Sequence, residues 1–419
     1  MRVTSLRTAA LVFLSCTALA GCGKGLSSQT TEHATVMVPA LSTHAAVGVS
    51  TINTTRLGGS TPVVDAAAVA LAAYPGLTPA TRPPMVVMVD DNDWPAALAS
   101  SVLAGAPLRA PLLYSEGSTL PQASRLALQA MRPTGTNALG PSPSGVTGRT
   151  QVLQIGDTPA LSDYAARPLA GAEPAALAVA IERLSSSLDG HSPRQLIVTA
   201  ANGQPAMTMP AAGLSAQTGA PILFVQHSRI PPATAAELAR LTGASIYVVG
   251  PRTVVSQHVV RELRHFGQVT RIDGSTPVAN AIAVARFSNG SFGWGVLEPG
   301  HGLVFASSSR PLDAPAAAPL SARGDYGPLL LVENAEVLPP ELGSYLSDLQ
   351  PGTPTSGPVH GVYNHGWLIG NGAAISAIVQ ARLDTLLELS SRPAPEASFA
   401  PTTPSNEPTP NESTQGSEP

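Results

Sequence analysis

The phrase RLGGSTPVVDAAAVA (residues 56–70) returns later in the chain as RIDGSTPVANAIAVA (residues 271–285). The interval between the two copies is wide enough for a third, and RPLAGAEPAALAVAIERL (residues 167–184) stands at its midpoint. In each copy a glycine (Gly59, Gly171 or Gly274) precedes a stretch rich in alanine and valine that is typical of a helix. Because self-similarity at a regular spacing is the signature of tandem units, we interpret the chain as three repeats.

Two further markers support this interpretation. A short apolar strand beginning at a proline follows each glycine by 50 to 54 residues, and the three prolines are Pro111, Pro221 and Pro328. Each repeat then ends in an apolar residue, a glycine and, six positions after that glycine, a serine; the pairs are Gly156 with Ser162, Gly250 with Ser256, and Gly370 with Ser376. The predicted repeats are residues 52–165, 166–269 and 270–390.

The middle repeat predicts the fold most clearly. It alternates short apolar runs (196–200, 221–225, 245–250) with segments of helical character (205–219, 230–243, 256–266). Strands that alternate with helices pair in parallel, so each repeat is predicted to be a small α/β unit. In such sheets the loops at the carboxyl ends of the strands bind ligands.

The amino-acid composition limits the classes of function that the chain can have. The chain of 419 residues is 43% hydrophobic and 12% charged, which is enough apolar material for several cores. It has 23 basic and 27 acidic residues and a formal charge of −4. Since a nucleic-acid binder needs a basic patch, we expect no nucleic-acid partner.

The first 22 residues have two early arginines and a short apolar run that is typical of a secretory signal. The run ends in LAGC, which resembles the lipobox of bacterial lipoproteins, so Cys22 is predicted to be acylated and to hold the protein on the outer face of the membrane. The alternative is an ordinary leader cysteine cleaved away elsewhere. Residues 23–51 are expected to be a polar tether, and residues 391–419, rich in Pro, Ser, Thr and Glu, a disordered tail.

The sequence contains few candidates for a catalytic or metal-binding site. No hydrolase, zinc-protease or nucleotide-binding motif is present, so we expect neither catalysis nor a cofactor. Asp90, Asp91 and Asp93 could bind Mg²⁺ or Ca²⁺, although a helix start is the simpler interpretation. His360 and His365 are five residues apart, which does not fit the helical spacing of zinc ligands.

Two aromatic features remain open. Trp94 is interpreted as an anchor between domains rather than a sugar platform. The glycine- and aromatic-rich segment at residues 287–302 could be a binding loop or a hairpin that packs against the rest of the molecule.

The order R-[LI]-x-G, P-[IL]-L and [VI]-G-x5-S resembles the cell wall binding repeat 2 family over residues 55–389. The resemblance implies three Rossmann-like units around a pseudo-threefold axis and non-covalent binding of a cell-wall polymer, either an anionic secondary polymer or peptidoglycan. It also implies that the P-[IL]-L segments contact the polymer. The chain departs from the family pattern, because the usual Asp-Arg-Tyr triplet is absent and the threonine that closes P-I-L-L-T is Ser115, Val225 or Val332.

The candidate polymer-binding residues lie in the loops after the P-[IL]-L strands and are Ser115, Ser118, Thr119, His227, Ser228, Arg229 and Asn334. Only the middle loop is cationic, so we expect it to contribute most to binding of an anionic polymer. The predicted function is a membrane-tethered, wall-associated binding protein. The alternative is a solute-binding lipoprotein of an uptake system, although three equal units do not fit its two lobes; an enzyme is the third choice.

Overall fold

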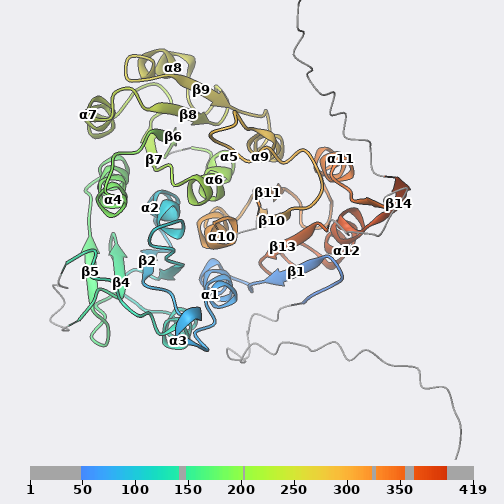
Figure 1. Cartoon of the computed structure of the whole chain (residues 1–419), viewed down its shortest axis with the longest axis horizontal. Coiled ribbons are helices and arrows are strands. Elements are labelled where there is room, and N and C mark those ends of the chain that lie inside the picture. Colours follow the sequence, from blue (N-terminus) through green and yellow to red (C-terminus); the bar gives the residue numbers. More distant parts are fainter. Residues whose placement is uncertain (1–48, 141–147, 202, 323–326, 354–362, 394–419) are drawn as a thin grey trace, which may run out of the picture. The chain divides into compact units, whose positions relative to one another are not determined.

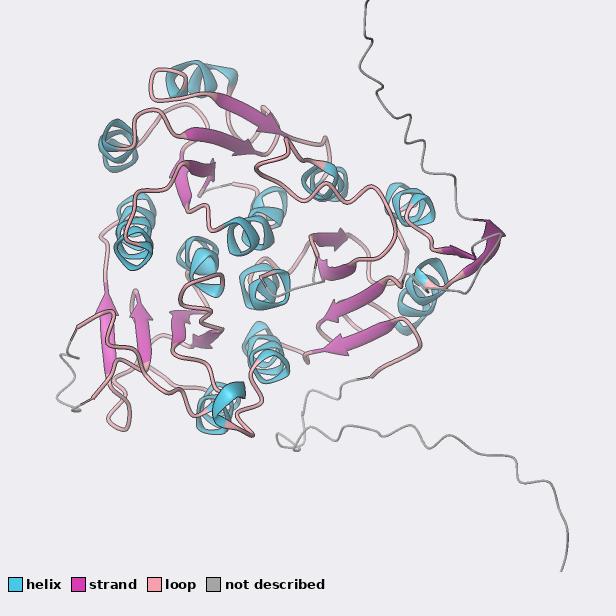
Figure 2. Cartoon of the chain, in the orientation of Figure 1, coloured by secondary structure: helices cyan, strands magenta, loops and turns pink. Residues whose placement is uncertain are grey.

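The computed structural model describes residues 49–140, 148–201, 203–322, 327–353 and 363–393. Three four-stranded sheets, all parallel, account for most of the strands in these residues, and helices flank each sheet (Figures 1 and 2). The predicted fold class, three α/β units with parallel sheets, is confirmed. Cys22, the leader and the segment from residue 394 onward lie outside the described residues.

The first sheet has the order β3-β2-β4-β5. Its strands are β2 (Val86–Asp90), β3 (Leu112–Ser115), β4 (Val152–Ile155) and β5 (Ala166–Leu169). The accompanying helices are α1 (Pro62–Ala73), η1 (Pro79–Thr81), α2 (Trp94–Ser100), η2 (Ser101–Ala104) and α3 (Gln122–Met131). Between β4 and β5 the described chain has no helix, so Ser162 caps none in this unit.

The second sheet has the same order, β7-β6-β8-β9. Its strands are β6 (Gln195–Ala200), β7 (Ile222–Val225), β8 (Ser245–Val249) and β9 (Val269–Ile272). Its helices are α4 (Pro174–Asp189), α5 (Pro205–Thr208), α6 (Pro210–Thr218), α7 (Pro232–Arg240) and α8 (Gln257–Leu263). The alternation predicted for the middle repeat is confirmed element by element.

The third sheet is built from both ends of the described chain. It has the order β1-β13-β10-β11, with β1 (Thr54–Leu57), β10 (Gly302–Ser307), β11 (Leu329–Val332) and β13 (His365–Ile369). Its helices are α9 (Pro277–Arg286), α10 (Asp313–Ser321), α11 (Pro340–Asp348) and α12 (Ala377–Leu387). A separate pair joins β12 (Gly352–Thr353) to β14 (Ser390–Pro393).

The repeated phrase is the crossing from one unit to the next. In each copy its arginine lies in a strand that pairs with one sheet: β5 with β4, β9 with β8, and β1 with β13. The helix that follows packs on a different sheet, because α1 contacts β3, α4 contacts β7 and α9 contacts β11. The sequence repeats and the sheets are therefore offset by one strand, and β1 completes the sheet at the far end of the chain.

Sterics explain the glycine at two of the three crossings. A Cβ on Gly171 would lie 2.6 Å from the backbone of Leu177, and one on Gly274 would lie 2.3 Å from the backbone of Ala279. The following helix could not approach the turn so closely with any larger residue. Pro62, Pro174 and Pro277 then begin the helices, where a missing amide hydrogen costs nothing.

Equivalent helices of the three units contact one another. Helix α10 contacts both α6 and α2, and α6 contacts η2. One alanine from each unit (Ala104, Ala216 and Ala318) forms a buried cluster at this junction. Small residues permit the close packing, since a Cβ on Gly213 of α6 would lie 2.7 Å from the Ser321 hydroxyl of α10.

The aromatic segment at residues 287–302 packs against the second sheet. Phe292 stacks on Tyr247 of β8 with ring centroids 3.7 Å apart, and Asn289 donates to the Tyr247 hydroxyl at 2.8 Å. Trp94 is partly buried against the main core. Both features therefore serve packing between elements. Within the described part of the chain, no helix has the length and apolar character needed to cross a membrane.

Candidate functional site

Each parallel sheet places the loops that follow its strands at one carboxyl edge, which is where ligands bind in this architecture. The loops after the P-[IL]-L strands all form tight turns. Backbone contacts close them between Glu116 and Thr119, between Gln226 and Arg229, and between Asn334 and Val337. Each of these loops is thus closed as a four-residue turn, although the closing hydrogen bonds differ among the units.

The edge of the second sheet is cationic. His227, Ser228 and Arg229 are exposed after β7, and Arg252 is exposed after β8. Arg229 donates through Nε to the Gln226 side chain at 2.5 Å, which fixes the direction of the guanidinium. The nearest carboxylate that directly follows a strand here is Asp273, after the outer strand β9.

Two loops of this edge are joined through the [VI]-G-x5-S motif. The Ser256 amide donates to the His227 carbonyl at 2.9 Å, and the Ser376 amide donates to the Ala335 carbonyl at 2.8 Å in the third unit. Both serine side chains also cap a helix, accepting from Val259 and Val379 respectively. The serine motif therefore positions the P-[IL]-L loop.

The arginine of the repeated phrase donates hydrogen bonds to the backbone near the carboxyl edge of the sheet. Arg271 donates to the carbonyls of Gly250 (2.5 Å) and Val255 (2.7 Å). Arg56 makes the equivalent bonds to Gly370 (2.9 Å) and Ile375 (2.7 Å). In the first unit Arg167 bonds instead to the Leu139 carbonyl. Arg56 and Arg271 are structural, because they donate to backbone carbonyls inside the fold and Arg56 donates also to the Gln380 side chain.

The edge of the first sheet is acidic. Asp93 caps α2 by accepting from the Ala96 amide at 3.0 Å, which confirms the helix-start interpretation for this residue. Asp90 accepts from Asn92 and from the Gly117 amide, each at 3.1 Å. Burial, followed by the charge of Asp90, raises the pKa of Asp91.

The candidate residues of the first unit are not equivalent to one another. Ser115 is fully buried, and its hydroxyl lies 3.4 Å from the Val89 carbonyl inside the sheet. Ser118 and Thr119 are exposed in the turn. In the third unit Asn334 is exposed, and its side-chain oxygen accepts from the Glu336 amide at 2.8 Å.

The helix starts after two of these loops offer few free amides. Helices α7 and α11 each begin with two consecutive prolines at the cap and first helical positions (Pro231 and Pro232; Pro339 and Pro340). Proline has no amide hydrogen, so free donors begin only at the next residue. Side chains must therefore provide most of the donors at these loops.

A buried ionic cluster lies beneath the carboxyl edge of the third sheet. Arg310 bonds to Asp65 of α1 and pairs with Asp313 of α10 at 2.9 Å, and both carboxylates are fully buried. Burial raises the pKa of Asp65 to about 6 and raises that of Asp313 well above its ordinary value. This cluster links the first crossing to the last unit.

Metal ligation has no support among the described residues, where no group of three or more His, Cys, Asp and Glu side chains could hold an ion. His365 lies on β13 beside Thr55 at 3.1 Å. His360 is outside the described residues.

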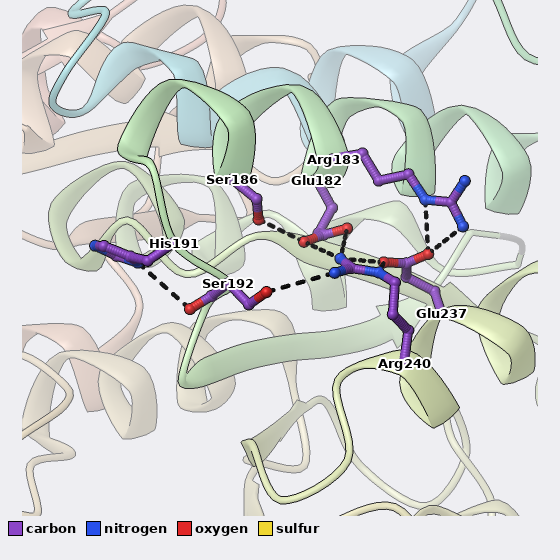
Figure 3. A network of polar contacts seen from close by, with 7 residues as sticks. All are labelled: Glu182, Arg183, Ser186, His191, Ser192, Glu237 and Arg240. Carbon is purple, nitrogen blue, oxygen red and sulfur yellow. Dashed lines mark hydrogen bonds and ion pairs between the residues drawn. The ribbon is translucent and has the colours of Figure 1, made fainter.

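A second ionic network was not predicted from the sequence. It joins α4 and α7 through Glu182, Arg183, Glu237 and Arg240 (Figure 3). The available signal was the spacing of Glu237 and Arg240, three residues apart on one helix face. The cross-helix partners are 54 to 58 residues away in sequence, which no local pattern reveals.

The comparisons fit this architecture. The model of Cell wall binding domain 2 (CWB2) matches residues 169–260 and 271–380. Among solved structures the chain is similar to Cwp6 from Clostridium difficile (TM-score 0.63, 16% identity, 85% of this chain and 52% of that chain). It is also similar to Cwp8 from Clostridium difficile (TM-score 0.59, 18% identity, 81% and 52%).

The chain spans about half the length of each of these two structures. At such identities the likeness shows the fold alone. No curated protein sequence gives a significant match.

Proposed function

Residues 169–260 and 271–380 of this chain belong to the cell wall binding domain 2 family, and on that premise we propose that the protein binds a cell-wall polymer non-covalently at the carboxyl edge of its second sheet. The observation that carries the site is the cationic edge formed by Arg229 and Arg252, with the exposed imidazole of His227 as a further hydrogen-bonding group. An anionic polymer suits this edge. Because the formal charge of the chain is −4, attraction must come from such local groups rather than from the whole molecule.

The other candidate loops make weaker contributions under this proposal. Ser118, Thr119 and Asn334 are exposed and can hydrogen-bond to a polymer, whereas neighbouring Glu116, Glu333 and Glu336 repel its negative charge. The proposed mechanism has no catalytic step. The acceptor groups of the polymer are bound by side-chain donors held in tight turns, so little side-chain entropy is lost on binding.

Co-sedimentation of the purified protein with cell walls tests this function, before and after secondary polymers are stripped from the walls. We expect the double variant His227→Ala and Arg229→Ala to bind about tenfold more weakly at low salt, where charge interactions are least screened. The matched control is Arg264→Ala and His265→Ala, which removes the same exposed residue types at the end of α8. Equal binding of wild type and the first variant at every salt concentration would rule out the site.

We further propose that Cys22 carries a lipid that tethers the protein to the membrane. The support is the lipobox-like LAGC sequence after an apolar run. Two acyl chains provide stable anchoring, at about 0.8 kcal/mol per buried CH₂ group. A fatty-acid probe should label the wild type and not Cys22→Ser; equal labelling of both would refute the tether.

A further inference from the structure

A polar pocket lies on the opposite side of the second unit from the proposed polymer site. It has a volume of about 640 Å³ and is lined by Arg183, Ser186, Ser187, His191, Ser192 and Arg240, with Gly190. Gly190 to Ser192 lead into the start of β6, and Arg240 ends α7 shortly before β8. The pocket therefore sits at the amino edge of the sheet, whereas His227 and Arg229 follow its carboxyl ends.

The arginines of the pocket are held in place by two carboxylates beneath them. Glu182 and Glu237 have no exposed surface. Arg183 donates twice to Glu237, at 2.8 and 2.6 Å, and Arg240 donates to Glu237 at 2.5 Å and to Glu182 at 3.0 and 3.1 Å (Figure 3). Rigid donors lose little freedom when a ligand binds, so this support preorganises the pocket.

The pocket surface itself offers hydrogen-bond donors. Its lining contains two guanidinium groups, three serine hydroxyls and an imidazole, and no carboxylate. The Ser186 hydroxyl donates to Glu182 at 2.6 Å, so the hydroxyls available as donors are those of Ser187 and Ser192. Arg183 keeps 59% of its side chain exposed, and its Nη1 has no partner among the described residues. The free Nη1 side of the Arg183 guanidinium, with adjacent hydroxyls, can donate to the oxygens of a tetrahedral anion.

The two buried carboxyl groups affect each other's pKa. Burial and the hydrogen bond to Glu237 raise the pKa of Glu182, while hydrogen bonds from Glu182 and the arginines outweigh burial and lower the pKa of Glu237. The groups that oppose an anion are the carbonyl ends of α4 and α7 and the exposed Asp189, which lines a neighbouring depression instead.

We propose that this pocket binds a phosphate or phosphodiester group through Arg183, Arg240 and the adjacent serine hydroxyls. If the network only held α4 and α7 together, the buried carboxylates and their arginines would be sufficient. An open pocket over the arginines would not be required for that role. The ligand class is shared by free phosphate, phosphodiester polymers and lipid head groups. Binding here is independent of the wall-binding site, since no residue belongs to both.

The test is a titration of the full chain with inorganic phosphate, followed by calorimetry and by NMR of the arginine Nε–H signals. We expect the signals of Arg183 and Arg240 to shift. Ser187→Glu should weaken phosphate affinity at least about tenfold, because it places a carboxylate at the pocket without removing any partner of Glu182 or Glu237. Ser344→Glu is the matched control, an exposed serine on α11. Arg183→Gln should also weaken binding.

Several results would overturn the proposal. These are unshifted arginine signals, wild-type affinity in Ser187→Glu, or an equal loss in Ser187→Glu and Ser344→Glu, which would indicate a general charge effect. Parallel titrations with a glycerophosphodiester and with phosphatidylglycerol vesicles identify the source of the group. Wall co-sedimentation of Ser187→Glu separates the two sites, because failure of phosphate binding leaves the His227 and Arg229 result unaffected.

Discussion

The carboxyl edges of the first and second sheets share a backbone plan and carry opposite charge. In the first unit the loops present Asp90, Asp91 and Glu116, whereas in the second they present His227 and Arg229. The strand order beneath them is the same. The buried side of the fold is thus constrained by packing, and the loops at the edge are free to change their chemistry.

The largest expected difference between these two units concerns the arginine beneath the edge. Arg271 makes two charge-assisted bonds to backbone carbonyls, so Arg271→Ala should lower the free energy of unfolding by about 4 kcal/mol. Among the described residues Arg167 makes one such bond, and the loss of that bond in Arg167→Ala should lower the free energy of unfolding by about 1.5 kcal/mol. Denaturant unfolding of both variants measures the difference, and equal losses would contradict a special role for the Arg271 contacts.

The sequence predicted what depends on local patterns. The strands and helices of the middle repeat follow from apolar runs, prolines and glycines, and β6, α7 and β8 lie where those signals place them. The strand exchange could not be predicted, because R-[LI]-x-G has the same local pattern whichever sheet it joins. Only long-range pairing, such as Arg56 with Leu368, decides that β1 completes the last sheet.

The candidate site, like the fold, could be predicted from the sequence only where it depends on local patterns. The motif located the loops, and their charges can be read directly from His227, Arg229 and Glu116. The sequence did not reveal that Ser115 is the buried last residue of β3, or that Arg271 is used on the backbone. It also missed Glu182 and Glu237, since their partners come from other helices.

The openings of the first and third repeats provide a second comparison, between Asp65 and Asn280. Both side chains accept from the amide of the crossing glycine, Gly59 at 2.5 Å and Gly274 at 3.0 Å. Only Asp65 titrates. Burial raises its pKa to about 6 from the ordinary 3.8, despite the neighbouring Arg310.

This pKa shift predicts a pH dependence of stability. Between about pH 4 and pH 6 the folded protein keeps a proton that the unfolded chain has released, so its stability falls as the pH rises through this window, by up to about 3 kcal/mol. Asp65→Asn keeps the acceptor for Gly59 and should flatten the curve, leaving the contribution of Asp313, which also faces Arg310. Free energies of unfolding measured at several pH values test this prediction. If stability changed with pH in Asp65→Asn as it does in the wild type, another group would cause the pH dependence.

The smallest expected effect tests whether the acidic edge of the first unit opposes the proposed function. Asp91→Asn together with Glu116→Gln removes two negative charges while keeping side chains of the same size. If an anionic wall polymer passes near all three carboxyl edges, weaker repulsion should strengthen wall co-sedimentation about twofold at low salt, with no change at high salt. Glu298→Gln with Glu388→Gln is the matched control, because both are exposed carboxylates outside these loops. The same gain in both pairs would indicate a general effect of net charge, and weaker binding of the first pair would mean that the acidic loops contribute contacts of their own.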